Sequence, residues 1–243
     1  MMPVLHLGPL NIAAAPLALL VAFFVLQDIG DRAGKRLHLR EGAVSSALLW
    51  GIGIGLVSAR LGYVLRYLEA YANEPLQIFA VNTGTLDITR GFIGGVLAGL
   101  IYIQRKQIDA RTFADALAPG LVLALAILSL GNLLSGDVYG AVARNLPWAI
   151  ALWGETRHPV QAYEMFAYAA IFAWLWWRAP RPFPGATFLF ALGVCALVRL
   201  LLEPLRDDSM LWTQGIRAAQ VIALGVLVIA SSLYVRGLHP RAK

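Results

Sequence analysis

Seven long apolar stretches divide this chain, and their length constrains its fold more than any other feature. Hydrophobic residues make up 59% of the 243 positions and charged residues only 14%, whereas a soluble domain has about 25% charged residues. Most stretches approach the roughly 20 residues that a helix needs to cross a bilayer, and such long runs argue against a transmembrane barrel. The sequence therefore predicts an all-α membrane protein in which residues 1–243 form a single domain of seven transmembrane helices. The predicted spans are approximately 10–27, 43–67, 90–104, 113–135, 160–178, 185–203 and 214–235.

Basic residues are distributed unevenly between the two sets of connecting segments. Segments 28–42, 104–112 and 178–181 and the C-terminal tail together hold 12 Lys and Arg residues, and the alternate loops hold only 4. By the positive-inside rule the richer side faces the cytoplasm, which places the N-terminus outside and the C-terminus inside. The net charge of +6 is thus explained by topology, and no nucleic-acid partner is expected.

Two further segments bear on the architecture. The first 27 residues contain no Lys or Arg, whereas a signal peptide begins with a basic segment, so the first stretch is expected to be a retained span. Residues 136–158 form one of the longest polar segments and lie on the outer side of the predicted topology. We expect this segment to fold back as a small external cap.

Ionisable side chains at the end of the sixth stretch suggest an anion site. Arg199 and Glu203 are four residues apart, and Arg206 follows Arg199 by seven, so all three share one helix face. One interpretation is an ion pair that neutralises itself and holds two helices together. The other is a phosphate site, in which a guanidinium forks onto the anion and a carboxylate orients it.

A second polar group lies where the fourth stretch reaches the outer face. It contains Asn132, Ser135 and Asp137, with Gly131, Gly136 and Gly140 around them. These residues fit a capped helix end with an Asx turn. They also fit a polar cradle for a lipid headgroup, because glycine permits close backbone approach.

The segment before the fifth stretch holds the histidine nearest to these groups. Pro159 suits the first position of a helix, and Gln161 and Glu164 then face the same way. His158 is either a structural residue at the interface or a proton acceptor, since the pKa of histidine lies near neutrality. No metal-ligand spacing, P-loop or dinucleotide fingerprint occurs in the sequence, so no cofactor or metal is expected.

In their order and spacing, these motifs resemble those of the prolipoprotein diacylglyceryl transferase family, and the likeness covers most of the chain. Members of this family are seven-helix enzymes of the bacterial inner membrane. They transfer a diacylglyceryl group from phosphatidylglycerol to the lipobox cysteine of a prolipoprotein, forming a thioether and releasing glycerol phosphate. The segments that carry the resemblance are Leu7–Leu10, Ala59–Val64, Gly91–Gly95, Leu130–Gly140, Arg157–Glu164 and Arg199–Glu203.

The resemblance implies roles for individual residues. Arg199 would bind the anionic headgroup, Glu203 would orient Arg199, and Asn132 and Asp137 would hold the glycerol portion, with Asp137 standing where the family usually has Glu. His158 is the candidate base for the substrate thiol. Further substrate contacts are expected from Gly140, Arg60 and Arg206. The expected partners are phosphatidylglycerol, the signal-peptide region of a prolipoprotein and membrane lipids.

Three departures from the family pattern occur in this chain, and in one of them the family's early Tyr-Gly pair reads Ala15-Pro16. The His-Gly-Gly motif reads Ile93-Gly94-Gly95, and the Arg before Leu-Gly-Asn is Ser129. The alternative hypothesis is therefore a catalytically silent relative that binds phospholipid or lipoprotein precursors. A transporter that uses Arg60, Arg199 and Glu203 is a third hypothesis, but no paired broken-helix pattern supports it.

Overall fold

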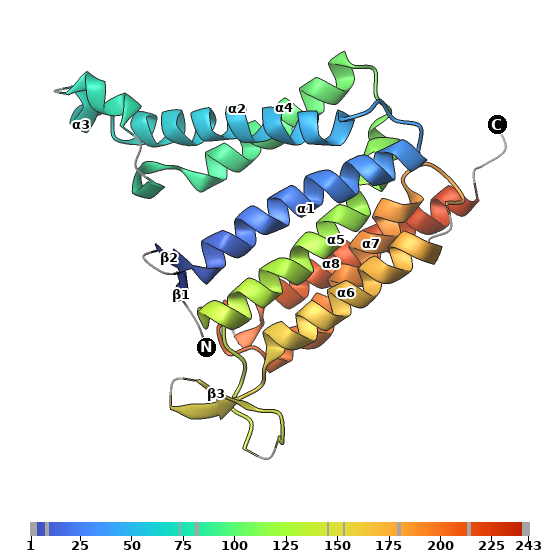
Figure 1. Cartoon of the computed structure of the whole chain (residues 1–243). Coiled ribbons are helices and arrows are strands. Elements are labelled where there is room, and N and C mark those ends of the chain that lie inside the picture. Colours follow the sequence, from blue (N-terminus) through green and yellow to red (C-terminus); the bar gives the residue numbers. More distant parts are fainter. Residues whose placement is uncertain are drawn as a thin grey trace. The chain divides into compact units, whose positions relative to one another are not determined.

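The computed structural model describes residues 4–7, 10–72, 74–80, 83–144, 146–152, 154–178, 181–212 and 215–239 (Figure 1). The chain divides into two compact units. Unit 1 combines Met1–Ala33 with Ala114–Lys243, and unit 2 comprises Gly34–Phe113. The prediction of a single domain stays a prediction, and each unit is described by itself.

Unit 1 is built from helices and two small hairpins. Its helices are α1 (Ala14–Arg36), α5 (Ala110–Ser135), α6 (Val160–Arg178), α7 (Ala186–Leu202) and α8 (Ala218–Leu238), with a 3-10 turn, η3 (Glu203–Leu205), after α7. The strands are β1 (Val4–Leu7), β2 (Leu10–Ala13), β3 (Ile150–Leu152) and β4 (Glu155–Arg157). Strand β1 pairs antiparallel with β2, and β3 pairs antiparallel with β4.

The core of unit 1 lies between α5, α6 and α7. Small side chains of α5, including Ala118 and Ala126, pack with Tyr168 and Leu175 of α6 and with Ala191 of α7. Alanine lets neighbouring helices approach closely, which is the usual packing solution in a membrane. Helix α1 lies along another side of α5, so that α5 is flanked by α1 and α7 (Figure 1).

Unit 2 is a helix pair that packs through glycine. It consists of α2 (Ala43–Arg66) and α4 (Ile88–Arg105), joined by α3 (Leu68–Ala72) and the 3-10 turns η1 (Pro75–Phe79) and η2 (Thr83–Thr85). A Cβ on Gly95 would lie 2.8 Å from the carbonyl oxygen of Gly51, and one on Gly55 would lie 3.0 Å from that of Gly91. These glycines therefore let the backbones of α2 and α4 approach closely.

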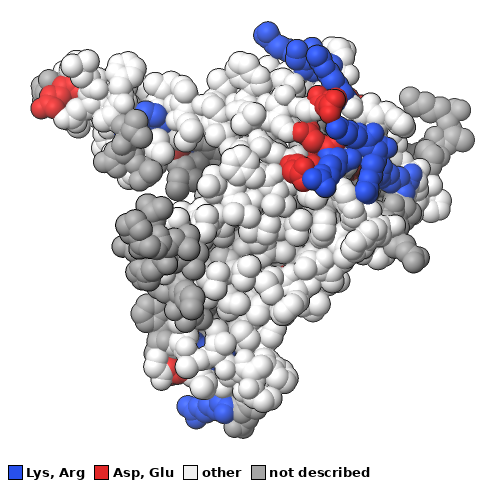
Figure 2. Space-filling model, viewed as in Figure 1, with Lys and Arg blue, Asp and Glu red and all other residues white. Residues whose placement is uncertain are grey.

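Five of the described helices are long and apolar enough to cross a membrane. They are α1, α2, α5, α8 and α7 extended to Leu205. In the face shown in Figure 2, charged side chains lie toward the ends of the unit 1 helices, and the described surface between them is uncharged. The chain is an all-α, multi-pass membrane protein. The third and fifth predicted stretches also form helices, α4 and α6, but they fall outside that group of five.

The helix that contains most of the first predicted span, 10–27, begins and ends later than that span. Residues Leu10–Ala13 form β2, and the helix runs from Ala14 to Arg36 instead of ending at residue 27. The prediction ended at the first charged residues, but charge does not end a helix. Arg32 and Asp28 form an i,i+4 ion pair at 2.9 Å, which supports the helical conformation. Basic residues in the last turn also suit the negative end of the helix dipole.

A buried carboxylate of α5 caps the start of α7. Asp115 is only 2% exposed, and it accepts hydrogen bonds from the backbone nitrogens of Gly185 at 2.8 Å and Phe188 at 2.9 Å. The first nitrogens of a helix have no partner within the helix. Asp115 therefore supplies from another helix the cap that α7 lacks locally.

We expect Asp115→Ala to lower the free energy of unfolding by about 1–3 kcal/mol, because it leaves buried donors without an acceptor. The matched control is Asp109→Ala, which removes an exposed cap at the start of α5 that accepts from the Thr112 nitrogen at 2.8 Å. Thermal unfolding in detergent measures both. An effect of Asp115→Ala no larger than that of Asp109→Ala would contradict the assignment of this cap.

Candidate functional site

The candidate site lies at the end of unit 1 where α5 and α7 terminate and α6 begins. The segment after α5 carries the β3–β4 hairpin and projects from this end (Figure 1). Backbone bridges pair Gly140 with Arg206 and Val142 with Arg157. The predicted cap segment is therefore pinned by backbone hydrogen bonds to the chain that follows α7.

Glu164, in the first turns of α6, joins two arginines. Its Oε1 atom accepts from Nη1 of Arg199 and from Nη1 of Arg206, both at 3.0 Å. The side chain of Glu164 is 6% exposed, so these charge-assisted bonds are weakly screened by water. One buried carboxylate thus connects α6 with α7 and with the segment after η3.

Arg199 also contacts Glu203 one helical turn later, as the i,i+4 spacing predicts. Arg199 Nη2 lies 2.9 Å from Glu203 Oε2, and the Glu203 side chain is 0% exposed. This contact is an ion pair by distance without hydrogen-bond geometry, since neither Glu203 carboxylate oxygen has a hydrogen-bond partner among the described residues. The side chain of Arg199 remains 34% exposed, which makes it the most accessible arginine of those bound to Glu164.

Arg206 and Arg217 complete the cluster. The Nε and Nη2 atoms of Arg206 donate to the two carboxylate oxygens of Asp208 at 3.0 and 2.7 Å. Arg217 donates to the carbonyl oxygens of Glu203 at 2.9 Å and of Arg206, and to Ser209 Oγ at 2.8 Å. Arg217 therefore fixes the backbone on which Glu203 and Arg206 are placed. We call Arg199, Arg206, Arg217, Glu164, Glu203 and Asp208 the arginine cluster.

Arg157 forms a separate ion-pair group at the rim of the site. It donates to Asp207 at 2.8 Å and Glu155 at 2.6 Å, and its guanidinium lies over the Tyr139 ring. The hydrogen bond with Asp207 raises the pKa of Arg157 above its usual range. These contacts hold the β3–β4 hairpin to the segment after η3.

His158 is half-buried and lies just before the start of α6, which carries Glu164. Among the described residues it makes no hydrogen bond or ion pair with the arginine cluster. Its backbone nitrogen donates to Ala141 at 3.0 Å, and its ring lies edge-on to Tyr163. The buried Nδ1 atom of His158 has no partner within the described part of the chain. The predicted role of His158 as a base stays a prediction.

The residues at the end of α5 form a capped helix terminus. The Asn132 carbonyl oxygen accepts from the Gly136 nitrogen at 3.0 Å, and Gly136 adopts φ 76°, as a glycine that ends a helix usually does. Asp137 is exposed, and its nitrogen donates to Ser135 Oγ at 3.3 Å. Gly140 is required for another reason, because a Cβ there would lie 2.2 Å from the carbonyl oxygen of His158. This geometry favours the capped-end interpretation.

Arg60, the remaining predicted contact, lies in unit 2. Its guanidinium donates to the carbonyl oxygen of Ile78 at 2.8 Å, to that of Thr85 at 3.1 Å and to that of Gln77. These bonds organise the connection between α2 and α4. Of the positions that depart from the family pattern, Ile93 is exposed on α4, and Ser129 is buried on α5 at 4% exposure.

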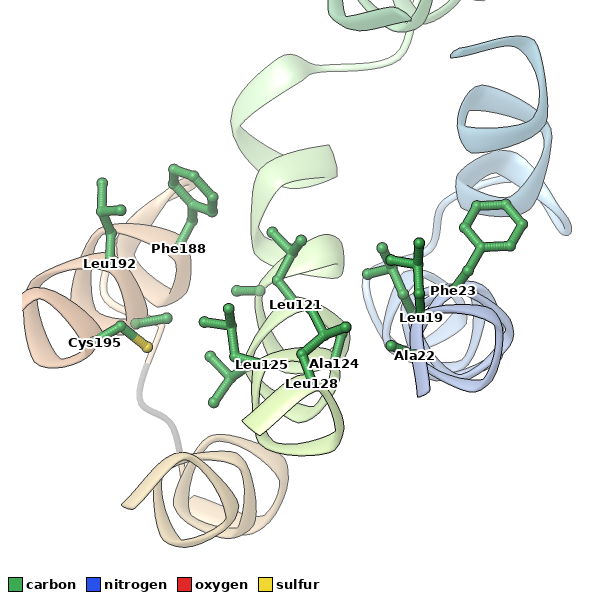
Figure 3. A pocket seen from close by; sticks show the side chains of 14 residues that line it. Leu19, Ala22, Phe23, Leu121, Ala124, Leu125, Leu128, Phe188, Leu192 and Cys195 are labelled. Carbon is green, nitrogen blue, oxygen red and sulfur yellow. The ribbon is translucent and has the colours of Figure 1, made fainter. Parts of the chain in front are cut away.

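An apolar groove of about 390 Å³ runs between α1, α5 and α7. Figure 3 shows its lining, which includes Leu19 and Phe23 of α1, Leu121 and Leu125 of α5, and Leu192 and Cys195 of α7. Cys195 precedes Arg199 by four residues, so the two share a helix face about 6 Å apart along the axis. On α5, Leu128 of the groove precedes Asn132 by the same interval. The groove therefore leads along both helices toward the polar end of unit 1.

Sequence reasoning missed three members of the arginine cluster. Glu164 was noted only for sharing a face with Gln161, although a carboxylate in an apolar helix is itself a signal of function. Arg217 and Asp208 lie outside any recognisable motif, and their partners lie in the turn η3 or in the segment that follows it. No group of three His, Cys, Asp or Glu side chains suited to a metal occurs among the described residues.

Fold and site together define a multi-pass membrane protein that has a partly buried cluster of arginines and carboxylates at one end of a helical unit. The family model described as prolipoprotein diacylglyceryl transferase matches residues 3–236. The chain belongs to this family.

Relatives named phosphatidylglycerol–prolipoprotein diacylglyceryl transferase cover most of the chain. The one from Clostridioides difficile (strain 630) is 34% identical over 197 residues, which are 81% of this chain and 79% of the relative. The one from Corynebacterium diphtheriae is 31% identical over 93% of this chain and 88% of the relative. The one from Trichormus variabilis is 31% identical over 96% of this chain and 90% of the relative.

Proposed function

We propose that this chain transfers the diacylglyceryl group of phosphatidylglycerol to the lipobox cysteine of prolipoproteins. The observation that carries the proposal is Arg199, which is bound on one side by Glu164 and Glu203 and remains 34% exposed on the other. A guanidinium held in this way is suited to an anionic phosphate. The names of the relatives supply the substrates.

The reaction requires a group that stabilises the departing phosphate. The cysteine sulfur attacks the diacylglyceryl carbon that bears the phosphate oxygen, a thioether bond forms, and the carbon–oxygen bond breaks. The electron pair of that bond leaves with glycerol phosphate, and the thiol proton passes to a base. Negative charge develops on the departing phosphate, where preorganised donors stabilise a transition state most. Arg199 is the donor that we place there, oriented by Glu164 and Glu203.

The other site residues have supporting roles in this proposal. Asn132 and Asp137 bind the glycerol portion, and Arg206 binds the phosphate beside Arg199. His158 accepts the thiol proton, which its unpartnered Nδ1 atom permits chemically. Gly140 keeps the segment after α5 close to His158. The bonds of Arg60 lie within unit 2, and its predicted substrate contact stays a prediction.

The apolar groove between α1, α5 and α7 accommodates an acyl chain of the same lipid. Its lining is apolar, and all three helices are among those able to cross a membrane. Because the groove leads toward Asn132 and Arg199, a lipid lying in it would present its phosphate to the arginine cluster.

We place all seven long helices across the bacterial inner membrane, with the N-terminus outside and the C-terminus in the cytoplasm. The asymmetry of basic residues supports this orientation. Single cysteines at exposed positions in a Cys195→Ala background test it with a membrane-impermeant thiol reagent. Arg144→Cys is expected to react in intact cells, whereas Lys35→Cys and Lys106→Cys react only after permeabilisation. Reaction at position 35 or 106 in intact cells, or none at 144, would overturn the orientation.

Expression in a bacterium depleted of its own diacylglyceryl transferase tests the activity. The chain should restore lipid attachment to a reporter prolipoprotein, detected by incorporation of an alkyne-labelled fatty acid. A protein that inserts in the membrane and restores nothing would favour the silent relative, for which Ile93 and Ser129 are the motivating replacements.

A further inference from the structure

Two parallel donors of the Arg206 guanidinium, Nε and Nη2, are already bound to a carboxylate of the same chain; we call this pair of donors the Arg206 fork. Nε and Nη2 of Arg206 donate to Oδ1 and Oδ2 of Asp208 at 3.0 and 2.7 Å. A planar guanidinium presents this pair of parallel donors to a carboxylate or to a phosphate in the same way. Asp208 therefore occupies the position from which Arg206 would bind a phosphate group.

Asp208 is held by this contact alone among the described residues, whereas Arg206 is held independently. Asp208 lies outside any helix or strand, two residues after Arg206. The third nitrogen of Arg206, Nη1, remains bound to Glu164 at 3.0 Å, and its backbone nitrogen donates to the Glu203 carbonyl at 3.1 Å. Rotation of the Asp208 side chain would thus open the fork without moving the guanidinium.

The charge of the arginine cluster gives a reason for that rotation. Arg199, Arg206 and Arg217 balance Glu164, Glu203 and Asp208, so the cluster is neutral before a lipid arrives. An added phosphate would leave one excess negative charge in a site of low dielectric constant, which is costly. The side chain of Asp208 is 22% exposed, compared with 6% for Glu164 and 0% for Glu203. Asp208 is therefore the carboxylate that can return to water at least cost.

We infer that Asp208 is a placeholder for the lipid phosphate, which displaces it from the Arg206 fork when phosphatidylglycerol binds. This inference rests on the proposed function, because it takes the phosphate of that substrate as the ligand. Asp208 excludes neutral lipids from the fork and admits an anion that binds Arg206 more strongly than the carboxylate does.

The first test compares Asp208→Asn with Asp207→Asn in the purified full chain in detergent. Both changes remove one negative charge from adjacent positions, but Asp207 pairs with Arg157 and not with Arg206. We expect Asp208→Asn to lower the Kd for phosphatidylglycerol roughly tenfold by removing the competing anion. Asp207→Asn should leave it unchanged, and neither change should alter the Kd for diacylglycerol. Equal or weaker binding of phosphatidylglycerol by a folded Asp208→Asn protein would overturn the inference. The inference would also be overturned if Asp208→Asn raised the affinity for glycerol 1-phosphate but not that for phosphatidylglycerol, because Arg206 would then bind the released product.

A second measurement uses the unaltered protein and does not depend on how a variant folds. Carbodiimide coupling of an amine to exposed carboxylates, read by mass spectrometry of peptides, should label Asp208 more strongly when phosphatidylglycerol is saturating, with no change at Asp207. Binding without increased labelling of Asp208 contradicts the placeholder alone. Failure of the unaltered protein to bind phosphatidylglycerol contradicts both the placeholder and the proposed function.

Discussion

Replacing Arg199 with alanine is expected to lower the rate of diacylglyceryl transfer by roughly 10²–10³-fold, which is the usual cost of removing one donor to an oxyanion that forms in the transition state. Arg199 is the accessible guanidinium of the arginine cluster, and its Nη1 and Nη2 atoms are fixed by Glu164 at 3.0 Å and Glu203 at 2.9 Å. Its positive charge is therefore already oriented before the lipid arrives. The measurement is the initial rate of thioether formation on a lipobox peptide with phosphatidylglycerol in detergent.

Arg144→Ala is the matched control for this prediction. Arg144 is an exposed arginine in the turn that follows Gly140, and the same loss of charge there should change the rate less than twofold, since exposed charges are screened. Arg199→Lys should recover only part of the rate, because lysine lacks the planar fork. Comparable losses for Arg199→Ala and Arg144→Ala would remove Arg199 from the reaction.

Replacing Glu164 with alanine is expected to cause the largest loss of stability. Its carboxylate is buried and accepts from both Arg199 and Arg206, so its removal leaves a buried guanidinium nitrogen of Arg206 and a partly exposed one of Arg199 without this acceptor. Breaking a buried ion pair by removing one partner costs about 3–5 kcal/mol, which corresponds to a fall in Tm of roughly 10 °C for a chain of this size. The side chain that connects α6 to α7 would also be lost.

Thermal unfolding in detergent checks this prediction against Glu155→Ala. Glu155 also pairs with an arginine, Arg157 at 2.6 Å, but its side chain is 51% exposed, so its removal should lower Tm by no more than a few degrees. A difference of about 2 °C in Tm corresponds to roughly 1 kcal/mol for a chain of this size. If the Tm values of Glu164→Ala and Glu155→Ala differ by less than that, the carboxylate of Glu164 does not stabilise the fold.

The helices were predictable because a bilayer demands long apolar segments. Segments 160–178 and 43–67 match α6 and α2 closely. The first helix continues past the predicted span, because the i,i+4 pair of Asp28 and Arg32 supports the helical conformation there. Strand β2 was not predicted because its mainly apolar residues were counted with the first span.

The candidate site was only partly predictable. Arg199 and Glu203 were found because a fixed helical interval places them on one face. Glu164 meets Arg199 across two helices, and that contact depends on how α6 and α7 pack. Asp208 and Arg217 depend on the turn η3, which ends α7 and redirects the chain. No periodicity in the sequence encodes such contacts, so they came only from the structure.

The most direct measurement is mass spectrometry of a lipobox peptide incubated with the purified, unaltered protein and phosphatidylglycerol. The account predicts a peptide whose cysteine carries a diacylglyceryl thioether, together with an equal amount of glycerol phosphate, and it predicts that both products are greatly reduced in the Arg199→Ala protein. A folded protein that binds phosphatidylglycerol and yields no thioether, or one that yields it equally well without Arg199, would contradict the account.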